Sequence, residues 1–115
     1  MNDSKPILIM VSCASSEQAM TIAKSLIDDK LVACAQISGP MTSLYTWNNE
    51  LETSSEVMMH LKSSMDCWGK IEAQIKRMHT YEVPEILAIE IDKISPSYER
   101  WLNSVLVPFN GEGLN

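Results

Sequence analysis

Positive charge is scarce in this 115-residue chain, in which 9 Lys and Arg residues face 15 Asp and Glu residues and leave a formal net charge of -6. Phosphate backbones and anionic lipid surfaces are bound chiefly through clustered Lys and Arg, which release counterions from the partner. The basic residues of this chain are few and scattered. The composition therefore argues against nucleic acid and membranes as partners.

Cysteine is also rare, and the chain has only Cys13, Cys34 and Cys67. An odd number of cysteines cannot pair completely within one chain, and no two of them lie close enough in sequence to indicate a zinc knuckle or a redox pair. We therefore expect free thiols, no disulfide framework, and a reducing, cytoplasmic location.

Long apolar segments are missing as well. Residues 1–5 lack the basic start and apolar stretch of a signal peptide. The longest uncharged run, residues 31–49, has 19 residues, but Gly39, Pro40 and several hydroxyl and amide side chains interrupt it. A run of that composition is not expected to cross a bilayer.

Phenylalanine occurs once, whereas methionine occurs eight times. A thioether can bind a soft metal or fill an irregular gap in a core. Most of these methionines fall on apolar stripes, as Met59 does beside Val57 and Leu61. We therefore expect core packing for most of them.

Hydrophobic periodicity predicts a regular succession of strands and helices. An apolar run at 7–11 predicts a strand that is buried on both faces and ends at Ser12 and Cys13, and Ser15 is suited to cap the helix that follows. The later predicted elements are a strand over 31–37, hairpin limbs over 42–47 and 51–62 around a turn at 48–49, a helix over 65–79, a central or doubly covered strand over 86–91, and a helix from 96 to 106. We expect a loose tail over 108–115.

The order β-α-β-β-α-β with a C-terminal helix predicts an α+β fold of the ferredoxin-like, split βαβ kind, with one domain over 1–115 and an ordered core of about 6–107. Fully extended, residues 31–47 would span about 56 Å, against about 23 Å for the first strand. The part of this segment beyond Gly39 and Pro40 must therefore bend back or project as a hairpin arm. An uncharged arm that bears Tyr45 and Trp47 is most simply covered by another subunit.

The same topology predicts a meeting point for residues that are distant in sequence. The first strand and the second helix point toward one end of the sheet, and the last strand starts there. Cys13, His79 and Glu85 are therefore expected to lie at that end, together with the tip of the hairpin. Thiolate and imidazole ligands together suit copper or zinc.

Several segments resemble, in order and spacing, the CutA family of divalent-cation tolerance proteins. They are Cys13 after an apolar strand, Leu31-Val32-Ala33-Cys34-Ala35, Thr42-Ser43-Leu44-Tyr45-Thr46-Trp47, the stretch 56–62, Tyr81-Glu82-Val83-Pro84-Glu85-Ile86, and the stretch 98–103. The resemblance covers about residues 6–106. It implies a ferredoxin-like subunit in a tight homotrimer, associated with copper and other divalent metals, usually cytoplasmic in bacteria, and without an established catalytic activity.

The resemblance also implies metal ligands. The family's described copper ligands are a cysteine at the end of the first strand and two adjacent histidines before the Tyr-x-x-Pro-Glu segment. By position these are Cys13 and His79, while the first histidine is replaced by Met78. A thioether can bind Cu(I) but is a poor substitute for imidazole with Cu(II). The predicted metal site is therefore Cys13, His79, Met78 and Glu85, with copper or another divalent cation bound weakly or not at all.

Each of these residues also has a purely structural interpretation. Cys13 can be a small buried apolar residue, and His79 can serve as a positive partner for a helix C-terminus. Two protein ligands do not make a strong site, so tight binding needs a third donor from the same end of the subunit or from a neighbour.

A second hypothesis is a ligand pocket at a subunit boundary. Glu85, Tyr45 and Trp47 would supply a carboxylate and aromatic faces, and Lys62 would supply an ammonium group. Within one subunit Lys62 is expected at the far end of its strand from Glu85, so only an intersubunit arrangement can join the two. Trp101 on the last helix is counted with these interface residues. The structural alternative is that Glu85 sets the trimer register and the aromatic residues are buried in the interface.

Enzymatic function is not expected. The position where copper chaperones of this topology carry a Cys-x-x-Cys pair holds Cys13-Ala14-Ser15-Ser16, and no nucleophilic triad with a recognisable context is present. We therefore expect a divalent-cation-binding tolerance protein, with a trimeric scaffold or small-molecule sensor as the alternative.

Overall fold

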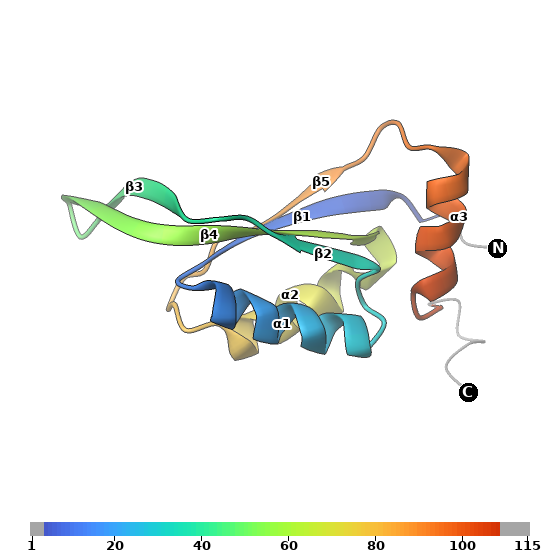
Figure 1. Ribbon diagram of the computed structural model, residues 1–115, viewed down its shortest axis with the longest axis horizontal. Helices are drawn as coiled ribbons and strands as arrows, with labels where there is room; N and C mark the ends of the chain where they lie inside the picture. Colours follow the sequence, from blue (N-terminus) through green and yellow to red (C-terminus); the bar gives the residue numbers. More distant parts are fainter. Residues whose placement is uncertain (1–3, 109–115) are drawn as a thin grey trace.

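The computed structural model describes residues 4–108 and has a mixed α+β fold with an antiparallel sheet (Figure 1). The elements are β1 (Pro6–Cys13), α1 (Ser16–Asp28), β2 (Cys34–Ile37), β3 (Met41–Trp47), β4 (Glu50–Ser64), the 3-10 turn η1 (Met65–Cys67), α2 (Trp68–Met78), β5 (Ile86–Glu90) and α3 (Pro96–Val105). The segment 31–47, which counts as the second strand in the predicted order, contains two strands, β2 and β3, on either side of Gly39 and Pro40. Of the predicted loose tail, all residues except Pro108 lie outside the described range.

The long strand β4 organises the sheet. Its second half pairs with β1 on one side and β2 on the other, and its first half pairs with β3. The strand β5 pairs with β1, which gives the order β2-β4-β1-β5 with every pair antiparallel. This register places the end of β1 beside the middle of β4, with Cys13 opposite Val57.

One face of the sheet is covered by the chain's own helices. Helices α1 and α2 contact each other and lie along that face (Figure 1). Alternate residues of β1 point into the resulting core, where Ile7, Ile9 and Val11 have no exposed surface. Val57, Met59 and Leu61 of β4 share this core, so the inner face predicted for that strand is confirmed. The prediction that the first strand is buried on both faces was wrong for the single chain, because Leu8 and Met10 of β1 are only partly buried.

The hairpin formed by β3 and the first half of β4 projects from the body as an arm, drawn at the left of Figure 1. It gives the molecule a long axis of 48 Å. Its two-residue turn has positive φ at both Asn48 and Asn49, 54° and 66°, the conformation that matches the twist of the flanking strands. The predicted hairpin turn is therefore confirmed.

The prediction of a strand from residue 31 onward was wrong for its first three residues. Lys30 adopts φ 59° at the end of α1, and the backbone N–H of Leu31 then donates to the carbonyl of Leu26. This reversal turns both Leu31 and Val32 into the core instead of onto opposite faces. The strand begins only at Cys34.

The prediction that residues 86–91 form a central or doubly covered strand was also wrong for the single chain. In the described part of the chain, β5 pairs only with β1 and lies at the edge of the sheet. Leu87 and Ile89 are 49% and 52% exposed on the sheet face opposite α1 and α2. Leu8 and Met10 lie opposite them on β1, so this face carries an uncovered apolar surface.

The helix boundaries follow local capping chemistry. The Ser15 hydroxyl accepts the Gln18 backbone N–H, which confirms the predicted cap, while the Gln18 side chain accepts from Ala14. Pro96 begins α3 as predicted, but Ser95 makes no side-chain capping bond. No helix within residues 4–108 has the length and apolar character needed to cross a membrane.

Candidate functional site

The loop over residues 79–85 joins α2 to β5 and is anchored to three other elements. The Gln18 side chain of α1 donates to the Thr80 hydroxyl over 2.8 Å. His79 is bonded to β1, and Tyr81 is bonded to β4. These bonds hold the loop against the end of β1 and the base of the arm.

His79 is almost fully buried, with 8% of the residue's surface exposed. Its Nδ1 accepts the backbone N–H of Tyr81 at 3.0 Å, so the ring proton lies on Nε2, which donates to the carbonyl of Ser12 at 2.8 Å. Both ring nitrogens are therefore engaged. Because Ser12 directly precedes Cys13, this contact places the imidazole beside the end of β1 that carries the thiol.

Cys13 lies in the core with no exposed surface. Burial, and to a smaller extent the negative charge of Glu56, raise the pKa of its thiol to about 11. The thiol therefore keeps its proton at neutral pH. Metals and electrophiles react with the thiolate, so this cysteine is not an activated nucleophile in the free protein.

Glu56 and Tyr81 complete this corner of the molecule. Glu56 is only 7% exposed, and its Oε2 accepts a hydrogen bond of 2.6 Å from the Tyr81 hydroxyl. Burial raises the pKa of that hydroxyl strongly, and the adjacent Glu56 carboxylate adds to the effect. The Tyr81 ring lies 4.8 Å from the His79 ring, so Tyr81 connects the imidazole to the buried carboxylate.

Beyond their places in segments that carry the family resemblance, neither Glu56 nor Tyr81 was predicted to be a functional residue. Their contact joins positions 25 residues apart and depends on the register of β4 against β1. Glu56 directly precedes Val57, the partner of Cys13 in the sheet. Glu56 could have been placed near Cys13 only from the pairing of the return limb of the hairpin with the first strand.

The predicted metal ligands are only partly gathered. Cys13 and His79 lie at the same corner, Met78 is half-buried against the core at the end of α2, and Glu85 is exposed. Within residues 4–108, no three His, Cys, Asp or Glu side chains are grouped so that they could hold a metal ion. The metal site therefore stays a prediction.

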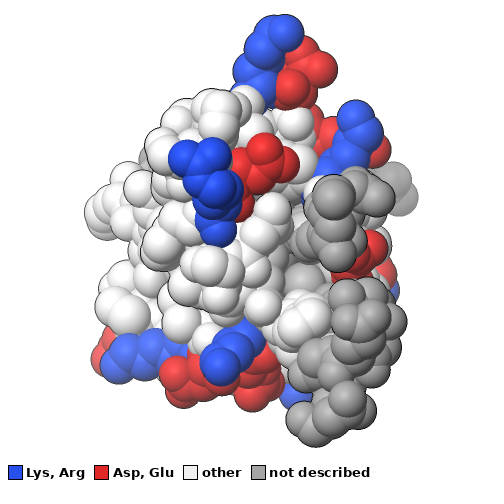
Figure 2. Space-filling model, turned by 90° about the vertical axis from the view of Figure 1, so that its right-hand side faces the viewer, with Lys and Arg blue, Asp and Glu red and all other residues white. Residues whose placement is uncertain are grey.

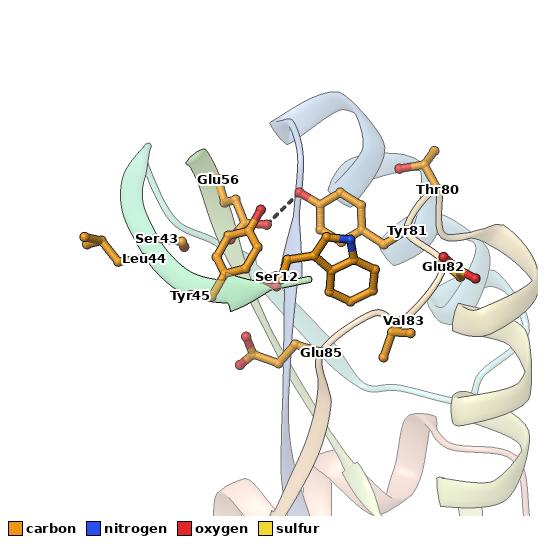
Figure 3. Close-up of a pocket in the computed structure, with 11 residues that line it drawn as sticks. Ser12, Ser43, Leu44, Tyr45, Glu56, Thr80, Tyr81, Glu82, Val83 and Glu85 are labelled. Atoms are coloured by element: carbon orange, nitrogen blue, oxygen red, sulfur yellow. Dashed lines mark hydrogen bonds between the residues drawn. The ribbon is translucent and has the colours of Figure 1, made fainter. Parts of the chain in front are cut away.

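A pocket of about 630 Å³ opens between the arm and the 79–85 loop (Figure 3). Its aromatic lining residues are Tyr45, Trp47 and Tyr81, and its charged lining residues are Glu56, Glu82 and Glu85. Figure 3 shows Ser43, Leu44 and Tyr45 on β3 at one side and the loop residues at the other. A concave site with aromatic walls and a few charged groups has the character of a small-molecule pocket.

The predicted interface residues fall into two groups in the single chain. Tyr45, Trp47 and Glu85 line the pocket. Lys62 lies toward the other end of β4, where its Nζ donates to Gln36 Oε1 at 2.5 Å. Trp101 is on α3 with its ring 5.4 Å from that of Tyr98. Lys62 and Glu85 are therefore apart within one subunit, as predicted.

The family model described as CutA1 divalent ion tolerance protein matches residues 7–105. The chain belongs to the CutA1 family. The divalent-cation tolerance protein CutA of Thermus thermophilus is 34% identical over 95 residues, which are 83% of this chain and 92% of that protein. Family membership supports a general role in tolerance of divalent metals.

Solved CutA1 structures have the same fold. The CutA1 of the psychrotrophic bacterium Shewanella sp. SIB1 superposes with a TM-score of 0.86 at 33% identity, over 91% of this chain and 98% of that one. A protein from Archaeoglobus fulgidus described as the periplasmic divalent cation tolerance protein CutA gives a TM-score of 0.84 at 30% identity, over 87% and 97% of the two chains. The family resemblance inferred from the motifs is thereby confirmed.

Proposed function

We propose that three copies of this chain assemble into a trimer that binds divalent cations, copper in particular, at the corner formed by Cys13 and His79. The observation that carries this proposal is the hydrogen bond from His79 Nε2 to the carbonyl of Ser12, which fixes an imidazole beside the residue that bears the thiol. Thiolate and imidazole suit copper and zinc. The proposed role is binding without catalysis, in the cytoplasm.

The proposed affinity is weak. Both nitrogens of His79 are hydrogen-bonded within the subunit, so a metal ion must displace one of these bonds. The metal ion also needs a third ligand. The nearest candidates by position are Met78, which precedes His79, and Glu85, at the other end of the 79–85 loop. A role in tolerance does not require tight storage of the metal.

The uncovered sheet face supports the trimer. Leu8, Met10, Leu87 and Ile89 form an apolar surface that helices α1 and α2 do not reach. The arm adds exposed Leu44, Tyr45, Trp47 and Leu51. An uncovered apolar surface of this kind favours association. The strand order β2-β4-β1-β5, with both crossover helices on one face, supports a ferredoxin-like subunit.

Native mass spectrometry of untagged protein, combined with metal analysis of the same preparation, tests this proposal. The expected result is a mass of three chains with substoichiometric to stoichiometric copper or zinc after incubation with the metal salt. A monomer at micromolar concentration contradicts the assembly. A trimer that gains no metal at millimolar salt contradicts the binding function.

A second candidate function is favoured by the pocket. It is a trimeric sensor or scaffold that binds a small molecule between the arm and the 79–85 loop, with metal binding incidental. Three of the predicted interface residues, Tyr45, Trp47 and Glu85, line that pocket. Recovery of a metabolite, but no metal, from the purified trimer would favour this candidate over the first.

A further inference from the structure

The charged residues of the pocket all have the same sign. Glu56, Glu82 and Glu85 line it, and its lining in the described part of the chain includes no Lys or Arg. Glu56 is buried, so its charge acts through protein and not only through solvent. By contrast, the end of the molecule that carries α3 shows Lys or Arg side chains next to Asp or Glu side chains (Figure 2). The residues that one chain contributes therefore give the pocket a local negative potential that the α3 end does not share.

The aromatic residues of the pocket add a second preference for positive charge. Tyr45 and Trp47 come from β3 and Tyr81 from the loop, so aromatic rings are supplied from two sides. The face of an aromatic ring attracts a cation through its quadrupole, and Trp does so most strongly. Rings also provide apolar area for a hydrocarbon body. Carboxylates and rings together select a ligand with one cationic end and one apolar part.

We propose that this pocket binds a small organic cation, an ammonium group carried on an apolar or aromatic body. This inference deepens the second candidate function and rests on it. The volume of about 630 Å³ lies within the range of small-molecule sites. An inorganic divalent ion fits less well, because the carboxylates are not grouped with a third ligand as such an ion requires.

Three probes of matched shape test the charge class on the intact protein: phenethylamine, which carries an ammonium at neutral pH, the neutral 2-phenylethanol, and the anionic 3-phenylpropionate. Binding is measured by isothermal titration calorimetry and by saturation-transfer NMR. Phenethylamine is expected to bind about tenfold more tightly than the alcohol, and the carboxylate is expected to bind most weakly.

Two variants locate the binding. Glu85→Gln and Glu82→Gln change exposed pocket residues and should fold normally, and each is expected to weaken phenethylamine binding severalfold while leaving the alcohol unaffected. Glu99→Gln on α3, a half-buried glutamate outside the pocket lining, is the control and should change neither. If Glu99→Gln also loses the preference for phenethylamine, the weaker binding is an effect of the protein's net charge, and the proposed site is overturned.

The probes also separate this inference from the function on which it rests. Equal binding of amine and alcohol, or preference for the carboxylate, overturns the proposal of a cationic ligand but leaves a small-molecule pocket. Preference for the carboxylate would indicate that a neighbouring subunit supplies an ammonium group there. No binding by any probe overturns both the cationic ligand and the small-molecule pocket. None of these outcomes affects the metal proposal, which is tested by its own titration.

Discussion

The Tyr81 hydroxyl donates a 2.6 Å hydrogen bond to Oε2 of Glu56, and this bond joins the loop after α2 to the base of the arm. On one side of the bond lie His79, in ring contact with Tyr81, and Cys13, whose thiol pKa is raised by burial and, to a smaller extent, by Glu56. On the other side lies the pocket, which both residues line (Figure 3). The proposed metal corner and the proposed ligand pocket therefore share one structural support.

Removing that hydroxyl should destabilise the protein. Tyr81→Phe leaves a buried carboxylate oxygen without its donor, and hydrogen bonds to charged groups contribute roughly 1.5–3 kcal/mol. The expected loss in free energy of unfolding is about 2 kcal/mol. Urea unfolding followed by circular dichroism, at one fixed subunit concentration, measures it.

Glu56→Gln is the matched variant for this bond. The amide oxygen can still accept from Tyr81, and the substitution removes a buried charge, so its loss of stability should be smaller than that of Tyr81→Phe. A Tyr81→Phe protein as stable as the wild type would show that the bond does not support the loop.

The turn of the arm should tolerate glycine and reject β-branched residues. Asn49 has φ 66°, a conformation that costs ordinary L-residues roughly 1–2 kcal/mol. Asn49→Val is therefore expected to lower the free energy of unfolding by about that amount, and Asn49→Gly to leave it unchanged or raised. Equal stability of the two variants, measured by urea unfolding, would argue against the positive φ.

A charge on the uncovered sheet face should prevent assembly. Ile89 is half-exposed in the single chain, so Ile89→Lys costs little within the subunit but places an ammonium group in the proposed interface. Light scattering is expected to give the mass of one chain for this variant. Met20→Lys, on the outer surface of α1, is an equally exposed control and should remain trimeric. If the Ile89→Lys protein is still trimeric, this sheet face is not part of the interface.

Local patterns predicted most of the fold. The apolar run of β1, the cap and stripe of α1 and the Asn48–Asn49 turn each depend on neighbouring residues, and the structure confirms them. The start of β2 was missed because Lys30 adopts a positive φ without being Gly or Asn, so no turn signal preceded Leu31.

The candidate site was less predictable. The apolar run of β5 looks the same whether its own chain or another chain covers it, so the sequence could not identify an edge strand. A single Glu and a single Tyr form no motif, and only the register of β4 brings Glu56 to Tyr81. Cys13 and His79 were located correctly at one corner because topology alone places the ends of β1 and α2 together.

Divalent-cation binding at the Cys13 and His79 corner is tested by calorimetric titration of Cu²⁺, with Zn²⁺ in parallel because zinc does not oxidise thiols. The wild type and the variants Cys13→Ala, His79→Ala and His60→Ala are compared. His60 lies on β4 with its side chain on the sheet face opposite the core, so it is a matched histidine control. Cys13→Ala and His79→Ala are each expected to weaken binding by about tenfold or more, whereas His60→Ala is not. Equal affinity in all four proteins would contradict binding at this corner.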